Sequence, residues 1–435
     1  MTDKSHQFGL WTLVALVVGN AIGAGIYTTS GFSLADLGDR NWVMLAWVVA
    51  GLIALMGAIS YGMLVQKLTE SGGEYLYLSR SIHPLAGFIA GWVSLLAGFP
   101  GAIAFAATAF ESYLRNAIDL SFISTDWLAA GIILFAGLIH IVRVKAGAIA
   151  HEWVVFLMII ALTLIIIWSL IVFSSRPELP VSHSQSTMFN WVAFANSLVW
   201  ISLSYSGFNA AAYVAGEVKN PKVTVRQGMV IGTLITMVLC VLVNGIILYG
   251  APYDALVGQP QIAAIAASHL SGEFGRRIVE ITIAVSLLTS ITAMVLAGPR
   301  VYAKMAEDGA LPAIFKARSG EPPRSSIVLQ VSTALLLVIV SDLQGLLSYL
   351  GLTLSLCLAL AVSSLFVRHW RRGEKPDSLF YPIAPLLFVG CTIGFAGLSA
   401  VNQPSKLLAV LPTIVLGTGA YLITSRRRLI LNEKS

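Results

Sequence analysis

The sequence predicts an all-α membrane protein with twelve transmembrane helices, and three observations lead to this prediction. Of its 435 residues, 57% are hydrophobic and 11% are charged, whereas an average soluble protein carries about 25% charged residues. The chain contains a series of apolar runs that approach or exceed the roughly 20 residues that a helix needs to cross a bilayer. Its Lys and Arg residues gather in alternate connecting segments. A soluble fold is therefore excluded.

Twelve apolar stretches define the predicted spans, and each is long enough to form a helix. They cover residues 9–35, 42–66, 84–114, 126–142, 148–173, 190–217, 227–250, 276–304, 325–341, 346–367, 381–401 and 407–425. We divide the chain into a first repeat of five helices (residues 1–174), a second repeat of five (175–375), and two additional C-terminal helices with a tail (376–435). The first stretch follows Lys4 as a signal peptide would, but no A-x-A-like cleavage site ends it, so we expect it to be retained.

The distribution of basic residues predicts the orientation of the chain. If the N-terminus is cytoplasmic, 21 of the 27 Lys and Arg residues fall in inside segments and six fall outside. This positive-inside bias predicts a multi-pass protein of the cell membrane with both termini in the cytoplasm. The net charge of +6 is spread over seven short segments, so nucleic-acid binding is not implied.

Two predicted spans contain helix-breaking sequences near their middles. The first span carries GNAIGAG at residues 19–25, and the sixth carries SYSGFN at residues 204–209. Small residues at these positions are also compatible with close helix packing. However, the two segments occupy the same place in the first and second sets of five helices. Interruptions at corresponding positions indicate an inverted-repeat transporter with discontinuous helices.

The chemistry of such a break follows from its backbone groups. If the helix stops near Ile22 and restarts near Gly25, the carbonyl oxygens of residues 19–22 lose their hydrogen-bond donors. The amides that open the next helix point free donors, aided by the helix dipole, at an incoming anion. A break in the sixth span frees further carbonyl oxygens near residues 203–206. A carboxylate and an ammonium would both be satisfied, so the pattern favours an α-amino acid as substrate.

These residues resemble the amino acid/polyamine/organocation (APC) superfamily of permeases, in particular its L-type amino acid transporter branch. Its first-span signature is matched at Gly23 to Tyr27. Other matching motifs are ESGGEY at residues 70–75, YSGFN at 205–209, KNP at 219–221 and EDGALP at 307–312. The resemblance implies a five-plus-five inverted repeat (the LeuT-type fold) with discontinuous first and sixth helices, and transport by alternating access instead of enzymatic catalysis.

The resemblance also implies a set of substrate-binding residues. Backbone amides would bind the substrate carboxylate, backbone oxygens would bind its ammonium, and an aromatic ring would close over it. The amides are those of Ala24 and Gly25, and the aromatic ring is that of Phe208. The backbone oxygens belong to Ile22, Leu203, Ser204 and Ser206. Asn209 would form a hydrogen bond across the pocket. Phe208 is also compatible with a core or lipid-facing role, and Asn209 with capping of the broken helix.

The coupling ion is predicted from a comparison with related transporters. Many proton-linked or exchanging relatives carry a lysine in the fifth span, and that position falls on Met158, whose thioether cannot replace an ammonium. The resemblance to sodium-coupled transporters of this fold implies one sodium site formed by oxygens of Gly19, Ile22, Ser286, Thr289 and Ser290, since a hard cation prefers oxygen ligands. The alternatives are a sodium-independent amino acid exchanger and a proton-linked amino acid or amine permease, because these hydroxyls also commonly bond within their own helix. We expect no other cofactor.

Charge limits the remaining choices. No Asp, Glu, Lys or Arg falls at the predicted midplane of spans 1, 3, 6, 8 or 10, and a charged substrate side chain would need a counter-ion there. This pattern favours neutral amino acids. Glu217 is predicted to pair with Arg300 at the cytoplasmic gate. An enzyme would need an activated nucleophile or paired carboxylates within the membrane, and a channel would need a selectivity filter; neither pattern is found. We expect the lipid bilayer as environment and no obligatory protein partner.

Overall fold

The fold was obtained as a computed structural model. It describes the backbone of residues 8–118, 120, 122–142, 144–175, 189–317, 321–340, 343–402 and 411–424, with side chains described throughout except at 142, 144–150, 343–349 and 402. Most of this described backbone is helical, and its isolated β-bridge joins Phe8 to Val218. The predicted all-α class is therefore confirmed.

Eight described helical segments are long and apolar enough to cross a membrane. They correspond to predicted spans 1, 2, 3, 5, 7, 8, 10 and 11. Predicted spans 4, 9 and 12 coincide with shorter apolar helices, and the sixth is divided into two pieces. Exposed side chains support a lipid environment, because α8 (Val144–Ser175) presents Trp153, Phe156 and Leu164 with 53% to 62% of their surface accessible. A water-soluble surface rarely carries such a continuous apolar patch. The number twelve, the inverted repeat and its boundaries stay predictions.

Three spans are composite. The first consists of α1 (Leu10–Ala21) and α2 (Ala24–Leu37). The third consists of α5 (Pro84–Val93), the π-helix η1 (Ser94–Gly98) and α6 (Phe99–Ala117), and the sixth of α9 (Trp191–Tyr205) and the 3₁₀-helix η2 (Ser206–Glu217). The remaining elements are α3 (Arg40–Lys67), α4 (Gly73–Ser81), α7 (Trp127–Val142), α10 (Pro221–Tyr249), α11 (Tyr253–Leu256), α12 (Ile262–Glu307), η3 (Ala313–Phe315), α13 (Arg324–Val340), α14 (Leu343–Arg372), α15 (Ile383–Asn402) and the helix Leu411–Thr424.

Local sequence explains where several helices begin and bend. Asp39 caps α3 by accepting a hydrogen bond from the Asn41 amide at 2.6 Å, and Asn190 caps α9 by accepting from two amides. Both side chains satisfy donors that a helix start leaves free. Pro84 opens α5 at a position where its missing N–H costs nothing. Gly272, with a φ of 67°, bends α12 ahead of the stretch predicted as the eighth span.

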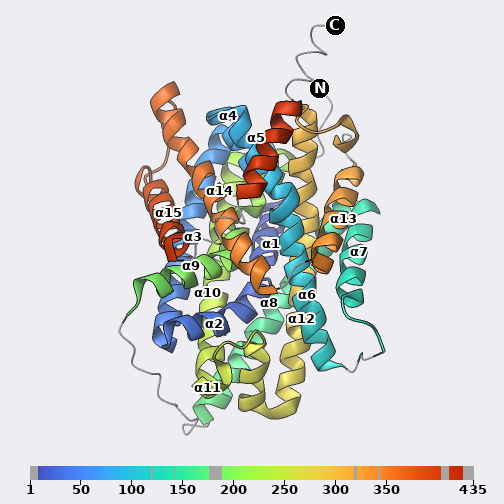
Figure 1. Ribbon diagram of the computed structural model, residues 1–435, viewed down its shortest axis with the longest axis vertical. Helices are drawn as coiled ribbons and strands as arrows, with labels where there is room; N and C mark the ends of the chain where they lie inside the picture. The colour runs from blue at the N-terminus through green and yellow to red at the C-terminus, as the bar shows by residue number, and fades with distance from the viewer. Residues whose placement is uncertain are drawn as a thin grey trace.

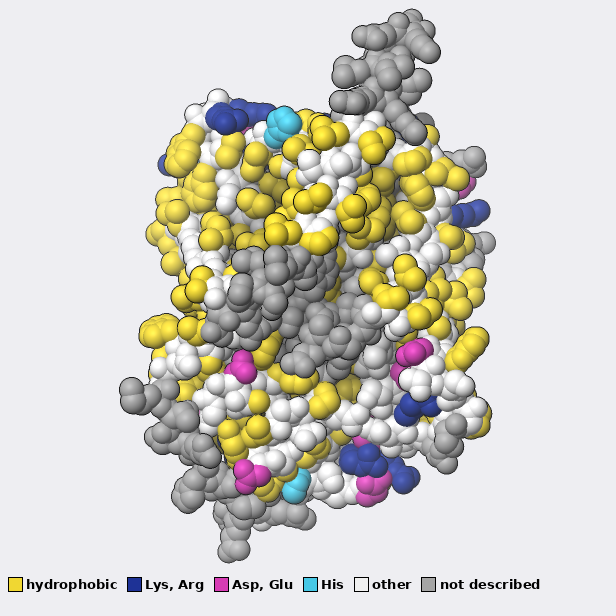
Figure 2. All heavy atoms as spheres, in the orientation of Figure 1, with side chains coloured by type: hydrophobic (Ala, Val, Ile, Leu, Met, Phe, Trp, Pro, Cys, Tyr) yellow, Lys and Arg dark blue, Asp and Glu magenta, His cyan; other side chains and the backbone are white. Residues whose placement is uncertain are grey.

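The two interrupted spans lie at the centre of the bundle. α1 packs against η2, α8, α10 and α12, so other helices surround both breaks. Figure 1 shows α4 and α11 at opposite ends of the molecule, as the predicted topology requires for one inside and one outside connection. Hydrophobic side chains cover much of the face in Figure 2, and charged side chains lie mainly towards the two ends. The molecule is a multi-pass membrane protein; which end faces the cytoplasm stays a prediction.

Candidate functional site

The break in the first span is a tight turn centred on Ile22. Ile22 has φ −78° and ψ 77°, and the Gly23 amide donates to the Ala21 carbonyl at 2.9 Å. This geometry is an inverse γ-turn, so the Ala21 oxygen, expected to be free, is occupied. No side chain caps the start of α2. The first amides of α2, beginning at Ala24 and Gly25, therefore have no capping side chain, which is the anion-binding arrangement that the sequence predicts.

The sixth span narrows at its break instead of unwinding. The helix changes from α to 3₁₀ at Ser206. The carbonyl of Leu203 accepts hydrogen bonds from both the amide and the hydroxyl of Ser206, the latter at 2.7 Å. The prediction of a free Leu203 carbonyl therefore needs correction, because the tighter helix and the serine side chain supply local donors.

Glycines allow the two broken spans to approach each other closely. A Cβ atom added to Gly207 would lie 2.4 Å from the Ala21 nitrogen, and one added to Gly25 would lie 2.2 Å from the Ser204 hydroxyl oxygen. Any larger residue would separate the segments. These contacts join the α2 start to the α9 end on one side of a shared cavity.

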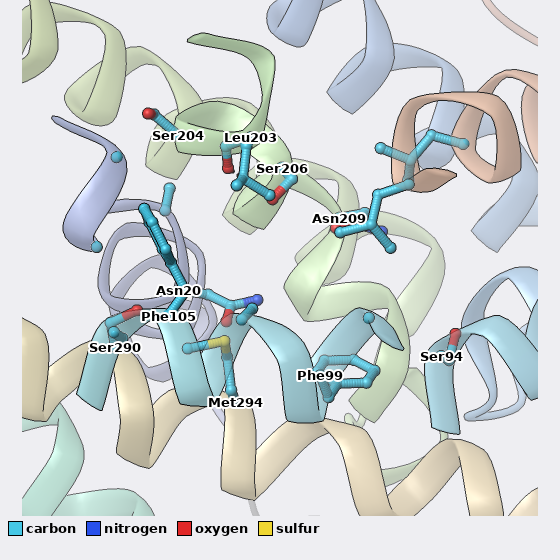
Figure 3. Close-up of a pocket in the computed structure, with 18 of the residues that line it drawn as sticks. Asn20, Ser94, Phe99, Phe105, Leu203, Ser204, Ser206, Asn209, Ser290 and Met294 are labelled. Carbon is cyan, nitrogen blue, oxygen red and sulfur yellow. Dashed lines mark hydrogen bonds between the residues drawn. The ribbon is translucent and has the colours of Figure 1, made fainter. Parts of the chain in front are cut away.

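That cavity is lined by both breaks together with α4, η1, α6, α12 and α14. Figure 3 shows Asn20, Phe105, Ser290 and Met294 across from the α9–η2 junction, with Asn209 and Ser94 towards the far end. Among the residues predicted to bind substrate, six line it: Ala24, Gly25, Leu203, Ser204, Ser206 and Asn209.

Two predicted residues lie elsewhere. Ile22 does not line this cavity, and its side chain is completely buried in the hydrophobic core. Its predicted role involves the backbone oxygen, so that role stays a prediction. The Phe208 ring packs against Tyr61 and Phe388, at centroid distances of 5.4 and 5.7 Å, and lines a separate apolar pocket beside α15. In this structure Phe208 therefore does not cover the cavity, and the alternative of a packing role describes its position.

Unpaired polar atoms in the cavity indicate where a ligand would bind. The Asn20 side-chain oxygen and the Ser204 hydroxyl are buried, and neither has a hydrogen-bond partner in the described part of the chain. Buried polar atoms normally have hydrogen-bond partners, so unpaired atoms in a cavity indicate a place where a ligand or water binds. Sequence reasoning used only the backbone of Asn20 and missed its side chain.

The third-span residues Gly98, Phe99 and Ala102 also line the cavity beside the π-helix, a distortion that is frequent at functional sites.

Glu74 is the main cavity residue that the sequence did not reveal. Its carboxylate is 3% exposed, and it accepts hydrogen bonds from the Tyr61 hydroxyl at 2.6 Å, the Asn209 amide at 2.7 Å and the Tyr213 hydroxyl at 2.8 Å. Glu74 lies in the first turn of α4, where the helix dipole favours negative charge. The sequence shows no charged residue at the midplane of spans 1, 3, 6, 8 or 10, but α4, a short helix outside the predicted spans, brings this carboxylate to the cavity.

The glycine pair before Glu74 explains how α4 reaches the cavity. Gly72 and Gly73 have positive φ values of 142° and 54°, and a Cβ at Gly73 would lie 2.1 Å from the Tyr213 ring. The signal was present in the ESGGEY motif, since paired glycines before a glutamate indicate a sharp turn. The direction in which this turn points α4, however, depends on contacts with residues distant in sequence.

Replacing Gly73 by alanine is expected to destabilise the protein and to lower transport. The left-handed backbone costs about 1–2 kcal/mol for alanine, and the contact with Tyr213 adds about 1–3 kcal/mol of overpacking. Thermal unfolding of the purified protein in detergent measures the sum. Gly258→Ala is the matched control, because Gly258 has φ 71° and nothing within 4 Å of the added atom. Equal losses for the two variants would contradict the close packing of Tyr213.

Three residues of the predicted sodium site, Ser286, Thr289 and Ser290, lie on α12, and Ser290 lies beside the first break. A Cβ at Gly23 would lie 3.0 Å from the Ser290 hydroxyl oxygen. Thr289 donates to the Ser286 carbonyl at 2.6 Å and lies 3.3 Å from the Met158 sulfur. Met158 of α8 thus contacts the predicted site, as the comparison of fifth spans suggested. Gly19 faces α8, since an added Cβ would lie 2.9 Å from a ring carbon of His151.

Comparison with known proteins identifies the family of this helical membrane protein. Residues 8–421 match the family described as amino acid permease. The chain belongs to the amino acid permease family. The match covers nearly the whole chain, which confirms the resemblance to the APC superfamily. Members of this family are transporters and not enzymes.

Curated relatives of this permease are amino acid transporters and exchangers. The serine/threonine exchanger SteT of Bacillus subtilis (strain 168) is 26% identical over 405 residues, covering 91% of this chain and 92% of that protein. The human cystine/glutamate transporter is 26% identical, covering 94% and 83%. The rabbit (Oryctolagus cuniculus) large neutral amino acids transporter small subunit 2 is 24% identical, covering 88% and 74%. The last name denotes a subunit, so the expectation of no protein partner is not confirmed.

Proposed function

We propose that this permease moves small neutral L-amino acids across the membrane by alternating access, coupled to one sodium ion. The observation that carries the amino acid assignment is the cavity at the two helix breaks, where the uncapped start of α2 lies beside the unpaired oxygens of Asn20 and Ser204. Amide donors suit a carboxylate, and oxygens suit an ammonium.

Cavity size supports a small substrate. The cavity has a volume of about 80 Å³, and roughly 10–15 Å³ accommodates one water-sized group. This space is compatible with a small amino acid such as alanine, serine or threonine. No Lys or Arg of the described chain lines the cavity, so an acidic side chain would find no counter-ion. Because Glu74 does line it, the preference for a neutral substrate depends on size and not on an uncharged wall.

The sodium proposal depends on the hydroxyl groups beside the first break. Ser286, Thr289 and Ser290 lie on α12 next to α1 and Met158, and a hydroxyl that donates one hydrogen bond keeps lone pairs for a cation. The alternative is sodium-independent exchange or proton-linked transport of amino acids or amines, and one relative is named as an exchanger. Competition by amines that lack the carboxylate would favour amine transport and would contradict the anion site at α2.

Uptake into proteoliposomes tests both parts of the proposal. Labelled alanine, serine and threonine should show saturable counterflow, and an inward sodium gradient should raise their accumulation relative to potassium. Met158→Lys is expected to reduce the ratio of sodium-driven to potassium-driven uptake to about 1, because the new ammonium would lie beside Thr289 in the position of the cation. Met158→Leu is the matched uncharged control and should keep the ratio high. Equal uptake of the unmodified protein under sodium, potassium and proton gradients would overturn the coupling.

A further inference from the structure

Glu74 differs from the other buried carboxylates of the described chain. Three glutamates are buried there: Glu74, Glu111 and Glu280. Glu111 pairs with Arg115 at 2.6 Å, and Glu280 pairs with Arg276 at 2.7 Å. Both pairs lie away from the cavity. Glu74 lines the cavity, and none of its hydrogen-bond partners carries a charge. Glu74 therefore lacks a permanent counter-charge. A buried carboxylate is normally either paired with a cation or protonated.

The groups that bind Glu74 can accommodate two protonation states. Ionised, the carboxylate accepts from two phenol hydroxyls and one amide, as observed. Protonated, it needs one acceptor, and a phenol oxygen can serve because a hydroxyl both donates and accepts. The Tyr213 oxygen already accepts from the Asn209 amide at 2.9 Å, so Tyr61 is the phenol with both lone pairs available. Tyr61 would turn its own hydrogen away, while Asn209 would continue to donate. A fixed guanidinium, such as the one that holds Glu111, offers no acceptor and would oppose protonation.

The surroundings of Glu74 contain no free positive charge in the described structure. Titratable groups that face it are Tyr61 from α3, Tyr77 from α4, Tyr213 from η2 and Cys357 from α14. All of them are neutral near neutral pH.

Three basic side chains, on α4 and on the helices α12 and α14 that pack against it, are already paired with carboxylates. The Lys304 side chain packs against Gly72, and its ammonium contacts Glu70 at 2.5 Å and Glu307 at 3.5 Å. On the far side of α4, Arg80 pairs with Asp308 at 3.1 Å, and Arg368 of α14 pairs with Glu374. These cations therefore do not neutralise Glu74.

We propose that Glu74 binds and releases one proton in each transport cycle. A proton from the aqueous phase adds to a carboxylate oxygen when the cavity opens towards one side of the membrane, and the same O–H bond breaks when the cavity opens towards the other. Protonation makes the cavity wall neutral and removes the cost of enclosing a bare charge with the substrate. The inference depends on the proposed amino acid transport. It adds a proton to the proposed transport and does not depend on the proposed sodium site, whose residues lie at the end of α1 and on α12 and not on α4.

The test uses reconstituted protein with labelled serine and no sodium gradient. We compare uptake with and without an inward proton gradient of one pH unit and use the ratio, which is independent of the amount of active protein. One coupled proton can raise accumulation up to about tenfold per pH unit. The unmodified protein should therefore give a ratio well above 1. Glu74→Gln should give a ratio of about 1, because the amide cannot be protonated.

Two control variants and one direct measurement complete the test. Glu74→Asp keeps a carboxyl group and should keep a ratio above 1. Glu152→Gln should match the unmodified protein, because Glu152 is partly buried on α8, bonded to Thr12, and outside the cavity. A pH-sensitive dye inside the vesicles should also record acidification when serine enters. Counterflow without serine-driven proton movement, or a Glu74→Gln ratio equal to that of the unmodified protein, would overturn this inference alone. Absence of counterflow would overturn the proposed function and this inference with it.

Discussion

Alanine at position 207 is expected to reduce transport more than tenfold. The added Cβ of Gly207→Ala would lie 2.4 Å from the nitrogen of Ala21, 2.7 Å from the carbonyl carbon of Asn20 and 2.8 Å from the Cα of Ala21. All three atoms belong to the backbone, so no side-chain rotation relieves the contact. The two broken spans must move apart, at a cost of about 1–3 kcal/mol or more. The cavity walls on both spans would shift with them.

Counterflow of labelled serine in proteoliposomes measures this effect, and size-exclusion chromatography of the purified protein shows whether the variant folds. Gly390→Ala is the matched control, because Gly390 lies in α15 with nothing within 4 Å of an added Cβ. It should transport at the unmodified rate. Near-normal counterflow by a folded Gly207→Ala variant would show that close contact between the broken spans is not required for transport.

Local backbone chemistry explains why the sequence predicts the breaks well. The turn at Ile22 ends at Gly23, which has no side chain to cap α2, so the uncapped helix start requires no knowledge of distant residues. The family motif at the same place, with residues of the sixth and eighth spans, then identifies the part of the cavity wall that the two breaks contribute.

Helix geometry explains why the direction of Phe208 was not predicted. A 3₁₀-helix has 3.0 residues per turn and an α-helix 3.6, so each residue after Tyr205 rotates further than an α-helical count assumes. By Phe208 the difference is about 60°. The ring consequently packs towards α3 and α15. Whether a glycine-rich stretch unwinds or tightens depends on local bonds such as the one from Ser206 to Leu203.

Tertiary packing explains why Glu74 was missed. Its sequence position suggests a connection between spans, and connections usually lie at the surface. The turn at Gly72 and Gly73 instead brings α4 against α5, α14 and η2. Long-range contacts of this kind leave no periodic pattern in the sequence. The pairing of Glu217 with Arg300 was easier to predict, because a carboxylate and a guanidinium near the ends of two central spans have few other partners.

That ion pair should control how readily the cavity opens at the α4 end of the bundle. Arg300 of α12 is 8% exposed and holds Glu217 through two hydrogen bonds, at 2.5 and 3.2 Å. Its guanidinium also lies 5.6 Å from the centre of the Phe8 ring. Next to Glu217, the Gly216 amide donates to the Ser71 hydroxyl in the turn before α4. The ion pair and these contacts therefore connect α12 to the end of η2, to the turn before α4 and to the segment before α1.

Arg300→Ala is expected to favour the conformation that is open at this end by about 2 kcal/mol, or roughly 30-fold, since it leaves the partly buried Glu217 carboxylate without its cation. Cys357 reports the change because it lines the cavity. In a background with Cys240→Ser and Cys391→Ser, a membrane-impermeant maleimide applied from the α4 side should modify Cys357 faster in the variant. The positive-inside pattern predicts that this side is cytoplasmic, so inside-out vesicles expose it.

A double-mutant cycle separates loss of the pair from loss of either residue. Glu217→Gln alone should also raise the modification rate, and Arg300→Ala combined with Glu217→Gln should add little to Arg300→Ala, because the interaction is already absent. Two fully additive effects would instead mean that each residue acts through other contacts, such as the ring of Phe8 for Arg300. An unchanged Cys357 rate in every variant would show that the cavity is closed at the α4 end by packing of η2 and α1 and not by this ion pair.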